Sequence, residues 1–440
     1  MSLRKINRRS PWCWIPTLYF AEGIPYVAVM TIAVILYKRM GVSNAQIAFW
    51  TSLIMLPWTL KPLWSPFVDI LKTRRWWIIM MQLLVGAGLA GIAFTIPTSF
   101  FLQVTLAFFW LLAFSSATHD IAADGFYMLG LNEKKQAYFV GIRNTFYRFA
   151  VIFGQGILVM FAGWLEQRYA REMPETAAIP QAWSLTFYLL TILFALLFVY
   201  HYLFLPHPRR DTCTLPPQQA SAGRVFKEFL GTFTSFFQKK HIVSALIFIL
   251  LYRFAEAQLV KITSPFLLDT PATGGLALST AEVGFIYGTI GVIALTIGGI
   301  VGGIAMARRG LKSCLWTMTI AMNLPNIVYL YLSFARPESI GIISGCVAIE
   351  QFGYGFGFTS LTYFMMLFSN GKHQTAHYAI CTGFMALGLM LPGMISGWIE
   401  ESIGYRAFFV WIMLCTIPSF WATHLVRKNL TDNHSDNSSR

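Results

Sequence analysis

The sequence predicts an all-α polytopic membrane protein with twelve transmembrane helices. Hydrophobic residues make up 56% of its 440 residues and charged residues only 12%, which is about half the charged share of an ordinary soluble protein. The apolar residues come in long runs rather than in the amphipathic periods of soluble helices. Together, the composition and the long apolar runs place the chain in the membrane.

A hydrocarbon core about 30 Å thick needs around 20 residues of helix. On this basis we expect helices at 12–37, 45–64, 76–96, 101–128, 137–165, 183–205, 242–267, 281–306, 313–333, 338–369, 374–399 and 405–426. A proline-containing polar linker with an amphipathic piece at 225–237 divides them. We therefore expect a six-helix half at 1–205, a cytoplasmic linker at 206–241, a second six-helix half at 242–426 and a polar tail at 427–440.

Lysine and arginine gather in alternate loops. If the N-terminus lies inside, the inner segments hold 22 of the 33 basic residues and the outer segments hold 6. The positive-inside rule then places both termini in the cytoplasm. This distribution explains the net charge of +14 without nucleic acid as a partner. The first apolar run is too long for a signal peptide, so we expect it to remain as a helix.

The six cysteines are scattered and have no spacing typical of a metal site or a disulfide framework. We expect buried thiols, and we predict no metal and no cofactor.

The two halves contain an internal repeat. Leu18-Tyr-Phe-Ala-Glu22 is similar to Leu251-Tyr-Arg-Phe-Ala-Glu256, and Ser43-Asn-Ala-Gln-Ile-Ala-Phe49 aligns with Ser279-Thr-Ala-Glu-Val-Gly-Phe285. A third pairing sets the loop with Asp69, Arg74 and Arg75 beside the loop with Arg308 and Arg309, and we expect these loops to act as inner gates. Two parallel six-helix halves are the layout of the major facilitator fold, with a site between the halves near the midplane.

Residues 115–155 contain four charges inside apolar helices: Asp120 and Asp124 in the fourth helix, Arg143 and Arg148 in the fifth. Each costs roughly 2.5 to 3.5 kcal/mol at the bilayer centre. Counted from the turn near residue 132, Asp124 matches Arg143 in depth and Asp120 matches Arg148. We expect these two pairs, which are either structural or part of a gate.

Asn144, Arg148 and Gln155 form one polar stripe along the fifth helix. A stripe facing lipid is unfavourable, so it must face other helices or a water-filled path. Arginine binds a carboxylate or phosphate through two hydrogen bonds, and Arg148 is therefore the first candidate for substrate contact. Arg143 is a further candidate.

Glu22 and Glu256 occupy equivalent places in the repeat, and Glu350 opens a glycine-rich stretch of the tenth helix. An acid without a local partner in a low dielectric exchanges protons readily, so these three join Asp120 and Asp124 as proton-coupling candidates. Arg253 is either the intrahelical partner of Glu256 or, with Tyr354, a substrate ligand.

Other charged or polar residues have simpler interpretations. We expect Lys261 to extend toward the outer surface and His119 to be hydrogen-bonded within the bundle. An alcohol phosphotransferase site at Asp124-Gly125 is rejected because Phe126-Tyr127 follow and no acidic set completes it.

Four segments carry a resemblance to a known family: Ser116 to Asp124, Lys61 to Asp69, Glu350-Gln351 with the glycine-rich helix, and Gln374 to Ala379. The chain resembles the AmpG-type muropeptide permeases of the major facilitator superfamily, which are related to the acetyl-coenzyme A transporters. His119 stands where glutamine is usual in that family, and Glu22 where a small or polar residue is common.

The resemblance implies proton-driven uptake of anhydromuropeptides, sugar-peptide fragments of the cell wall, across a bacterial inner membrane for recycling. It places Asp120, Asp124 and Arg148 in the family's pattern for the fourth and fifth helices, and Asp69 in its inner-loop pattern. The expected partners are an anionic or zwitterionic sugar-peptide, protons and the lipid bilayer, and we expect a monomer. The alternatives are a transporter of another organic anion, such as an acyl-coenzyme A or a siderophore-like compound, and a membrane sensor or integral-membrane enzyme.

Overall fold

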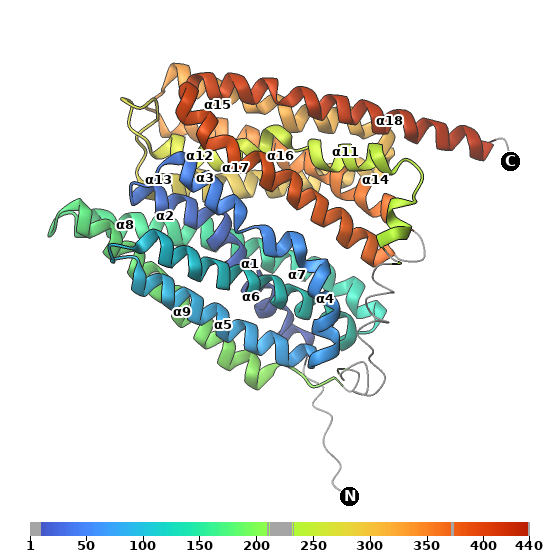
Figure 1. Ribbon diagram of the computed structural model, residues 1–440, viewed down its shortest axis with the longest axis horizontal. Coiled ribbons are helices and arrows are strands. Elements are labelled where there is room, and N and C mark those ends of the chain that lie inside the picture. The colour runs from blue at the N-terminus through green and yellow to red at the C-terminus, as the bar shows by residue number, and fades with distance from the viewer. Residues whose placement is uncertain (1–9, 209–210, 212–230, 232, 371–373, 439–440) are drawn as a thin grey trace, which may run out of the picture. The chain divides into compact units, whose positions relative to one another are not determined.

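The computed structural model describes residues 10–208, 211, 231, 233–370 and 374–438. Regular secondary structure among these residues is helical throughout, and each of the twelve expected ranges falls on helix (Figure 1). The prediction of an all-α chain is confirmed. Many of the expected helices are interrupted by π-helical turns or short breaks, which the hydropathy pattern does not predict.

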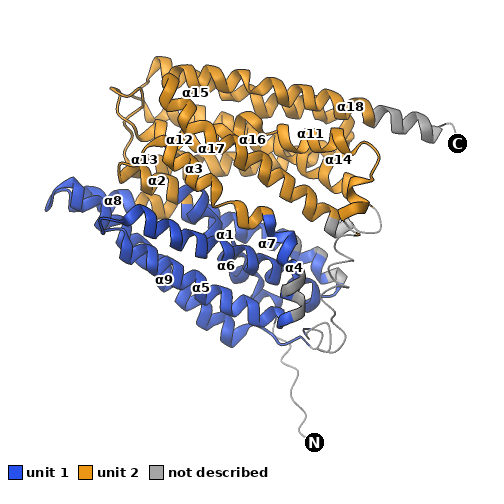
Figure 2. Cartoon of the chain, viewed as in Figure 1, with its two compact units in different colours: residues 1–32, 60–154, 161–225 blue, residues 33–59, 155–160, 226–440 orange. Residues whose placement is uncertain are grey.

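The chain forms two compact units (Figure 2). Unit 1 comprises residues 1–32, 60–154 and 161–225, and unit 2 comprises residues 33–59, 155–160 and 226–440. Two segments that precede the linker, 33–59 and 155–160, thus belong to the unit that contains everything after it. The expected boundaries of the two six-helix halves stay a prediction.

In unit 1, α5 packs against α6 and α9, and α1 packs against α6 and α7. Its buried core includes Trp14, Tyr19, Phe126 and Phe139. Side chains at the helix starts satisfy free backbone N–H groups: Thr73 accepts from Trp76 N, and Asn132 accepts from Lys135 N. The helices are η1 (Pro11–Cys13), α1 (Ile15–Val27), η2 (Ala28–Ile32), α5 (Arg74–Thr95), α6 (Phe101–Gly130), α7 (Glu133–Ile152), α8 (Val159–Tyr169) and α9 (Glu175–Phe204), with most of α4 (Leu56–Leu71).

In unit 2, α14 and α16 approach closely because glycines line their contact. A Cβ added to Gly298 would lie 2.2 Å from the carbonyl oxygen of Phe352, and one added to Gly355 would lie 2.0 Å from that of Leu295. The helices are α2 (Ala33–Arg39), α3 (Asn44–Leu53), α11 (Ile242–Leu251), α12 (Phe254–Leu268), α13 (Thr280–Val283), η4 (Gly284–Gly291), α14 (Val292–Asn323), η5 (Leu324–Asn326), α15 (Ile327–Ala335), α16 (Ile340–Ser369), α17 (Gln374–Leu414) and α18 (Thr416–Ser438), with most of η3 (Phe153–Leu158).

The two repeated serines have the same structural role. Ser43 is the N-cap of α3 and accepts a hydrogen bond from Gln46 N, and Ser279 is the N-cap of α13 and accepts one from Glu282 N. Both segments are therefore helix starts with a polar residue at the third position. This agreement supports the internal repeat seen in the sequence.

Two glycines with positive φ mark turns inside long helical stretches. Gly310 has φ 71° and Gly404 has φ 76°, a conformation that glycine adopts without the steric cost of a Cβ atom. They lie in the expected loops 307–312 and 400–404, so α14 and α17 each contain parts of two expected spans.

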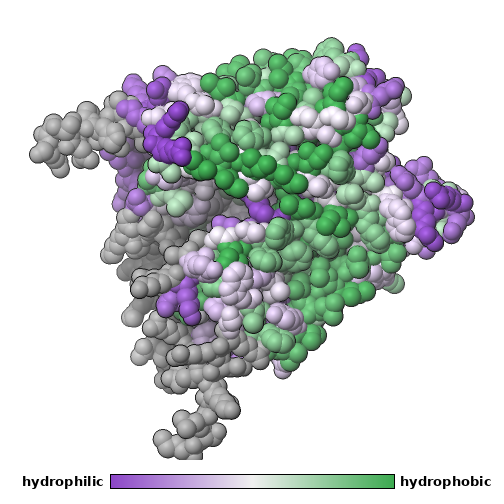
Figure 3. All heavy atoms as spheres, turned by 180° about the vertical axis from the view of Figure 1, so that it is seen from behind, coloured by the Kyte–Doolittle hydropathy of each residue, from purple (hydrophilic) through white to green (hydrophobic). Residues whose placement is uncertain are grey.

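Eight helical stretches of the described residues are long and apolar enough to cross a membrane, and two of them, Thr280–Ala335 and His377–Asn429, exceed 50 residues. Large apolar side chains are exposed along them, among them Phe94, Leu196 and Val243. Figure 3 shows such side chains gathered over much of one face. Exposed apolar surface on this scale is the surface expected for contact with lipid.

Candidate functional site

Unit 1 holds a charge cluster built around Asp124 and Arg143. The guanidinium of Arg143 lies 2.8 Å from Asp124 Oδ1, and the Tyr19 hydroxyl donates to the same carboxylate oxygen at 3.2 Å. Arg143 also stacks over the rings of Tyr19, at 4.3 Å, and Tyr127, at 5.3 Å. The predicted Asp124–Arg143 pair is confirmed. Sequence reasoning missed both tyrosines, although Tyr127 stands one helical turn after Asp124 on the same helix face.

Asp120 forms an ion pair with Lys61 of α4, with 3.1 Å between Nζ and Oδ2. Its expected partner, Arg148, is half-buried. Among the described residues it forms no ion pair. The expected pairing is wrong because a depth count fixes the height of a residue in the bundle but not which neighbouring helix its face meets.

Glu22 of α1 is only 9% exposed, and its Oε2 has no hydrogen-bond partner among the described residues. Asp120, Asp124, Lys61 and Arg143 all lie within electrostatic range of it. At the next residue, Gly23, a Cβ would lie 2.7 Å from Ala150 Cβ of α7. The buried carboxyl group therefore stands beside a close helix contact and next to two further acids.

The polar stripe expected on the fifth helix is interrupted. Asn144 is exposed and Arg148 half-buried, one turn apart on α7, but Gln155 lies in the π-helix η3 and belongs to unit 2. A π turn holds more residues than an α turn, so the spacing of seven no longer places Gln155 on the face of Arg148. Instead its carbonyl oxygen lies against η4, where a Cβ added to Gly288 would be 1.9 Å away.

A buried chain of hydrogen bonds connects four helices of unit 1. Gln82 of α5 bonds through its Nε2 to His119 Nε2 at 3.1 Å and through its Oε1 to His201 Nδ1 at 3.0 Å. His201 Nε2 in turn lies 2.9 Å from the Thr17 hydroxyl. His119 is thus hydrogen-bonded within the bundle, as predicted.

Unit 2 contains three of the predicted charged residues, all buried. Arg253 is 8% exposed, Glu256 4% and Glu350 2%. Glu350 Oε2 accepts hydrogen bonds from the Tyr329 hydroxyl at 3.1 Å and from Gln351 Nε2 at 2.9 Å. Glu256 lies within electrostatic range of both Glu350 and Arg253.

Lys261 does not reach the surface as expected. It is 1% exposed, and its Nζ donates to Thr51 Oγ1 of α3 at 3.1 Å. Gly393 of α17 allows a close approach here, since an added Cβ would lie 2.8 Å from Ser52 Oγ of α3 and 3.1 Å from Ala257 O of α12. The outward extension fails because α3 and α17 cover this face of α12.

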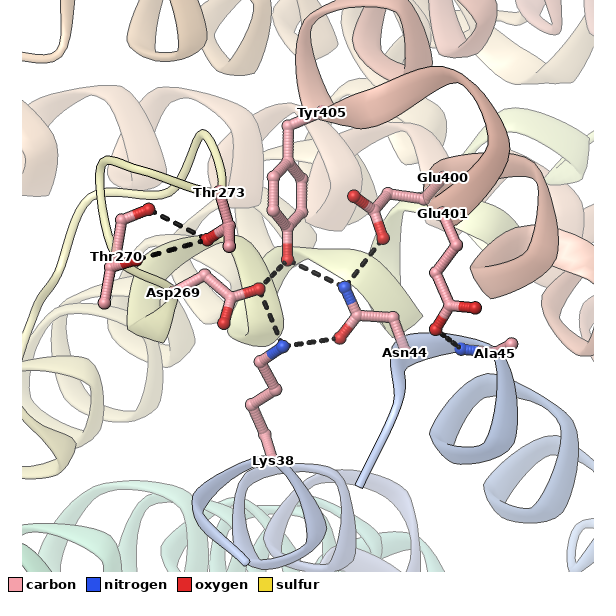
Figure 4. A network of polar contacts seen from close by, with 9 residues as sticks. All are labelled: Lys38, Asn44, Ala45, Asp269, Thr270, Thr273, Glu400, Glu401 and Tyr405. Atoms are coloured by element: carbon pink, nitrogen blue, oxygen red, sulfur yellow. Dashed lines mark hydrogen bonds and ion pairs between the residues drawn. The ribbon is translucent and has the colours of Figure 1, made fainter. Parts of the chain in front are cut away.

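A polar cluster joins the turn between α2 and α3 to the end of α12 and to the turn at Gly404 inside α17, all within unit 2 (Figure 4). Lys38 Nζ lies 2.6 Å from Asp269 Oδ2 and donates to Asn44 Oδ1 at 2.8 Å. The Tyr405 hydroxyl donates to Asp269 at 2.5 Å and accepts from Asn44 Nδ2 at 2.9 Å. Each of these polar groups therefore has at least two partners.

Two acids of α17 complete this cluster at the start of α3. Asn44 Nδ2 also donates to Glu400 Oε2 at 2.7 Å, and the backbone N–H of Ala45 donates to Glu401 Oε1 at 2.8 Å. A carboxylate is favourable at the positive end of a helix. No alternation or motif in the sequence predicts these contacts, which join residues more than 350 positions apart. We call the set Lys38, Asn44, Asp269, Glu400, Glu401 and Tyr405 the hairpin cluster.

Of the expected gating loops, the first is tied to the start of the linker. The backbone N–H groups of Arg74 and Arg75 donate to the Asp211 carboxylate at 2.8 and 3.0 Å, and Arg75 Nη2 donates to Tyr202 O at 2.5 Å. Sequence reasoning missed Asp211, an acid in a basic segment. The side chain of Asp69 lies outside the described residues. In the second loop, Arg308 and Arg309 are exposed.

The described residues contain no group of three or more His, Cys, Asp or Glu side chains that could hold a metal ion.

Comparisons with known proteins place the chain among transporters. A family model described as Major Facilitator Superfamily matches residues 17–376. The chain is 24% identical over 416 residues to "Putative transporter AmpG 4" of Rickettsia conorii, a match that covers 92% of this chain and 93% of the relative. It is also 24% identical over 425 residues to "Anhydromuropeptide permease" of Escherichia coli K12, covering 94% and 79%.

Solved structures agree on the fold. The nucleoside transporter NupG matches with a TM-score of 0.65 at 13% identity, covering 94% of this chain and 98% of that one. A bacterial homologue of the human lysosomal transporter Spinster, inward-facing and unoccupied, matches with a TM-score of 0.66 at 15% identity, covering 95% and 98%. The expected major facilitator fold is confirmed.

Proposed function

The chain belongs to the Major Facilitator Superfamily, and from this premise we propose that it carries anhydromuropeptides into the cytoplasm together with protons. It is a multi-pass membrane transporter and not an enzyme. The similarity to the Escherichia coli permease over nearly the whole chain supports the cargo. The proposed setting is a bacterial inner membrane with both termini in the cytoplasm.

The observation that carries the proton coupling is the position of Glu22. Its buried carboxyl group stands beside Asp120 and Asp124, whose direct ion partners are Lys61 and Arg143. Among the described residues these three acids have two cations in ion-pair contact, and an unpaired charge in a low dielectric costs several kcal/mol. Taking up one proton removes that cost, and releasing it on the other side of the membrane couples the proton to transport.

We assign Arg148 and Asn144 to substrate contact in unit 1. Arg143 is already held by a carboxylate and two tyrosine rings, whereas Arg148 has no ion pair among the described residues, and Asn144 beside it is exposed. An arginine that keeps its fork free is suited to a carboxylate of the sugar-peptide.

We assign the hairpin cluster to closure of the outer side. By the positive-inside rule the turn after α2 lies outside, and the cluster fastens this turn to the end of α12 and to the turn at Gly404 inside α17. A transporter that exposes its site alternately must break these contacts to open outward. The cluster then stabilises the state that is closed to the outside.

Uptake by right-side-out membrane vesicles tests the transport proposal. Labelled anhydromuropeptide should accumulate faster when the outside is more acidic than the inside, and Glu22→Gln should weaken this stimulation by about tenfold or more. Glu172→Gln, an exposed acid of unit 1, is the matched control and should behave as wild type. Wild-type uptake that ignores the gradient would exclude symport, and uptake of acetyl-coenzyme A without any muropeptide would exclude the cargo.

A charge exchange tests the hairpin cluster. Lys38→Ala should weaken outer closure by about 1 to 3 kcal/mol, because Asp269 loses its cation in a mostly buried place. The measurement is the alkylation rate, from outside, of a single cysteine placed at Thr51. Lys38→Asp combined with Asp269→Lys should restore slow labelling in part. Labelling that stays slow in Lys38→Ala would contradict the assignment.

A further inference from the structure

The second copy of the repeat contains one residue more than the first, and the helix breaks at that residue. Leu18-Tyr-Phe-Ala-Glu22 lies in the continuous helix α1, whereas Leu251-Tyr-Arg-Phe-Ala-Glu256 is divided between α11 and α12. The extra residue is Arg253, the N-cap of the 15-residue helix α12, with φ −107° and ψ 21°. The insertion therefore places an arginine at the positive end of a helix inside the membrane-spanning region.

Arg253 is buried, but its guanidinium is only partly satisfied. Its Nη2 donates to the Tyr354 hydroxyl at 2.6 Å, and the guanidinium lies over the rings of Tyr354 and Phe358 at 5.1 and 5.0 Å. Its Nε is buried and has no hydrogen-bond partner within the described part of the chain. The guanidinium thus retains an unused N–H donor beside two aromatic rings.

The partner of Arg253 also lacks a charge. Arg143 in unit 1 contacts the Asp124 carboxylate, but Arg253 contacts a phenol, and no ion pair of the described residues includes it. A buried guanidinium is strongly stabilised by an oxyanion that accepts two hydrogen bonds. The Arg253 side chain is therefore positioned to bind an anionic group, and no described residue places such a group in contact with it.

Two buried acids belong to the same cluster as this cation, Glu256 directly and Glu350 through Glu256. Glu256 follows it in the first turn of α12, and Glu350 lies on α16 within electrostatic range of Glu256. The other ionisable groups that face them are Tyr329 of α15, Tyr287 of η4 and Tyr354 of α16. The cluster contains one cation and two acids, so an arriving oxyanion increases an existing excess of negative charge.

We propose that Arg253 binds an oxyanion of the transported molecule, and that Glu256 and Glu350 hold the protons that this binding requires. The inference rests on the proposed function in that the chain moves an anionic small molecule. With both acids ionised the site has a charge of −1, and a bound oxyanion would make it −2. One or two protons taken up by the two carboxylates restore the balance, and release of cargo returns them. Substrate and proton are then coupled in unit 2 through one arginine.

Calorimetric binding to the purified full-length protein tests this proposal. The probes are an anhydromuramyl tripeptide, its carboxamide, in which the peptide carboxylates are neutral, and acetyl-coenzyme A, whose anion is a phosphate. Titration in two buffers of different ionisation enthalpy gives the number of protons bound. Wild type should bind the acid with net proton uptake. Arg253→Gln should weaken binding of the acid by about 10- to 100-fold and binding of the carboxamide by much less. Glu256→Gln should lower the number of protons taken up on binding.

Controls separate a binding role from a structural one. Arg253→Lys keeps the charge without the fork and should retain part of the affinity, while Arg168→Gln, an exposed arginine of unit 1, should bind as wild type. Equal losses for acid and carboxamide would overturn the oxyanion role, and binding without proton uptake would overturn the coupling. If only acetyl-coenzyme A binds, with the same dependence on Arg253, the proposed cargo is wrong and this inference stands. If wild type binds neither the anhydromuramyl tripeptide nor acetyl-coenzyme A, the proposed cargo and this inference are both overturned.

Discussion

The segments Leu18–Glu22 and Leu251–Glu256 share five residue types in the same order, but they hold their cations differently. In the first, Tyr19 donates to Asp124 and supports Arg143, a residue of another helix. In the second, Tyr252 bonds to Gly357 O and Ser360, and the cation is the inserted Arg253 itself. The first copy thus supports a neutralised arginine, and the second carries an arginine that contacts no acid of the described residues.

The two copies of the repeat place different residues beside their arginines, which gives the two arginines different roles. Asp120 and Asp124 of α6 are four residues apart, and so are Glu350 and Tyr354 of α16. Replacing the second acid by a tyrosine leaves the neighbouring arginine without its carboxylate. We infer that the arginine of unit 1 is held by a carboxylate of the chain itself, whereas the arginine of unit 2 is available for a ligand.

Deleting Arg253 should have the largest effect. Removing one residue ahead of α12 shifts the helix by about 1.5 Å and rotates it by about 100°, which moves Glu256 and Lys261 off their present faces. We expect complete loss of uptake and a lower unfolding temperature. Arg253→Ala keeps the spacing and should lose affinity while staying folded. If the deletion and the substitution behave alike in uptake and unfolding, the spacing has no role.

Arg143→Ala should have an intermediate effect on stability. It leaves Asp124 without its cation and removes contacts with two rings, and because the pair is partly exposed we expect a loss of about 1 to 3 kcal/mol in unfolding free energy. Arg253→Ala removes no ion pair and should cost less. The measurement is denaturant unfolding in detergent, with Asp124→Asn completing a double-mutant cycle. A larger loss in Arg253→Ala would reverse our comparison.

Gly23→Ala should have the smallest effect of the three. The first copy has Gly23 after its glutamate, where the second has Ala257. An added Cβ would lie 2.7 Å from Ala150 Cβ, so α1 and α7 must move apart at a cost of about 1 kcal/mol or somewhat more. Gly141→Ala is the control, because nothing lies within 4 Å of its added Cβ, and it should stabilise α7 slightly. The same unfolding assay should separate the two, and equal changes would argue against the close contact.

Much of the fold follows from the sequence because it depends on local patterns. The apolar runs predict the helices, and Ser43 and Ser279 mark equivalent helix starts. The Asp124–Arg143 pair follows from equal depth on consecutive helices. The Lys61–Asp120 pair depends on how α4 and α6 turn their faces, which no spacing within either segment determines.

The remaining features arise from contacts between distant segments. The π turn at Gln155 occurs where η3 meets the glycines of η4, and an apolar run contains no separate signal for such a turn. The hairpin cluster joins Asn44 to Glu400, and it becomes visible only when the chain is folded. The surface position expected for Lys261 fails for the same reason, because its cover comes from α3 and α17.

The chain of Thr17, His201, Gln82 and His119 has two ways to place its hydrogens. Turning the Gln82 amide by 180° exchanges the positions of its oxygen and nitrogen. His119 Nε2 then donates to the Gln82 oxygen, and His201 Nδ1 accepts from the Gln82 nitrogen. His201 Nε2 donates to the Thr17 hydroxyl, which donates to Trp14 O. Every group stays satisfied, and the heavy atoms keep their outline. The buried hydrogen-bond chain therefore has two tautomeric states. The nitrogen chemical shifts of the ring of His119, the neighbour of Asp120, would report which state is present.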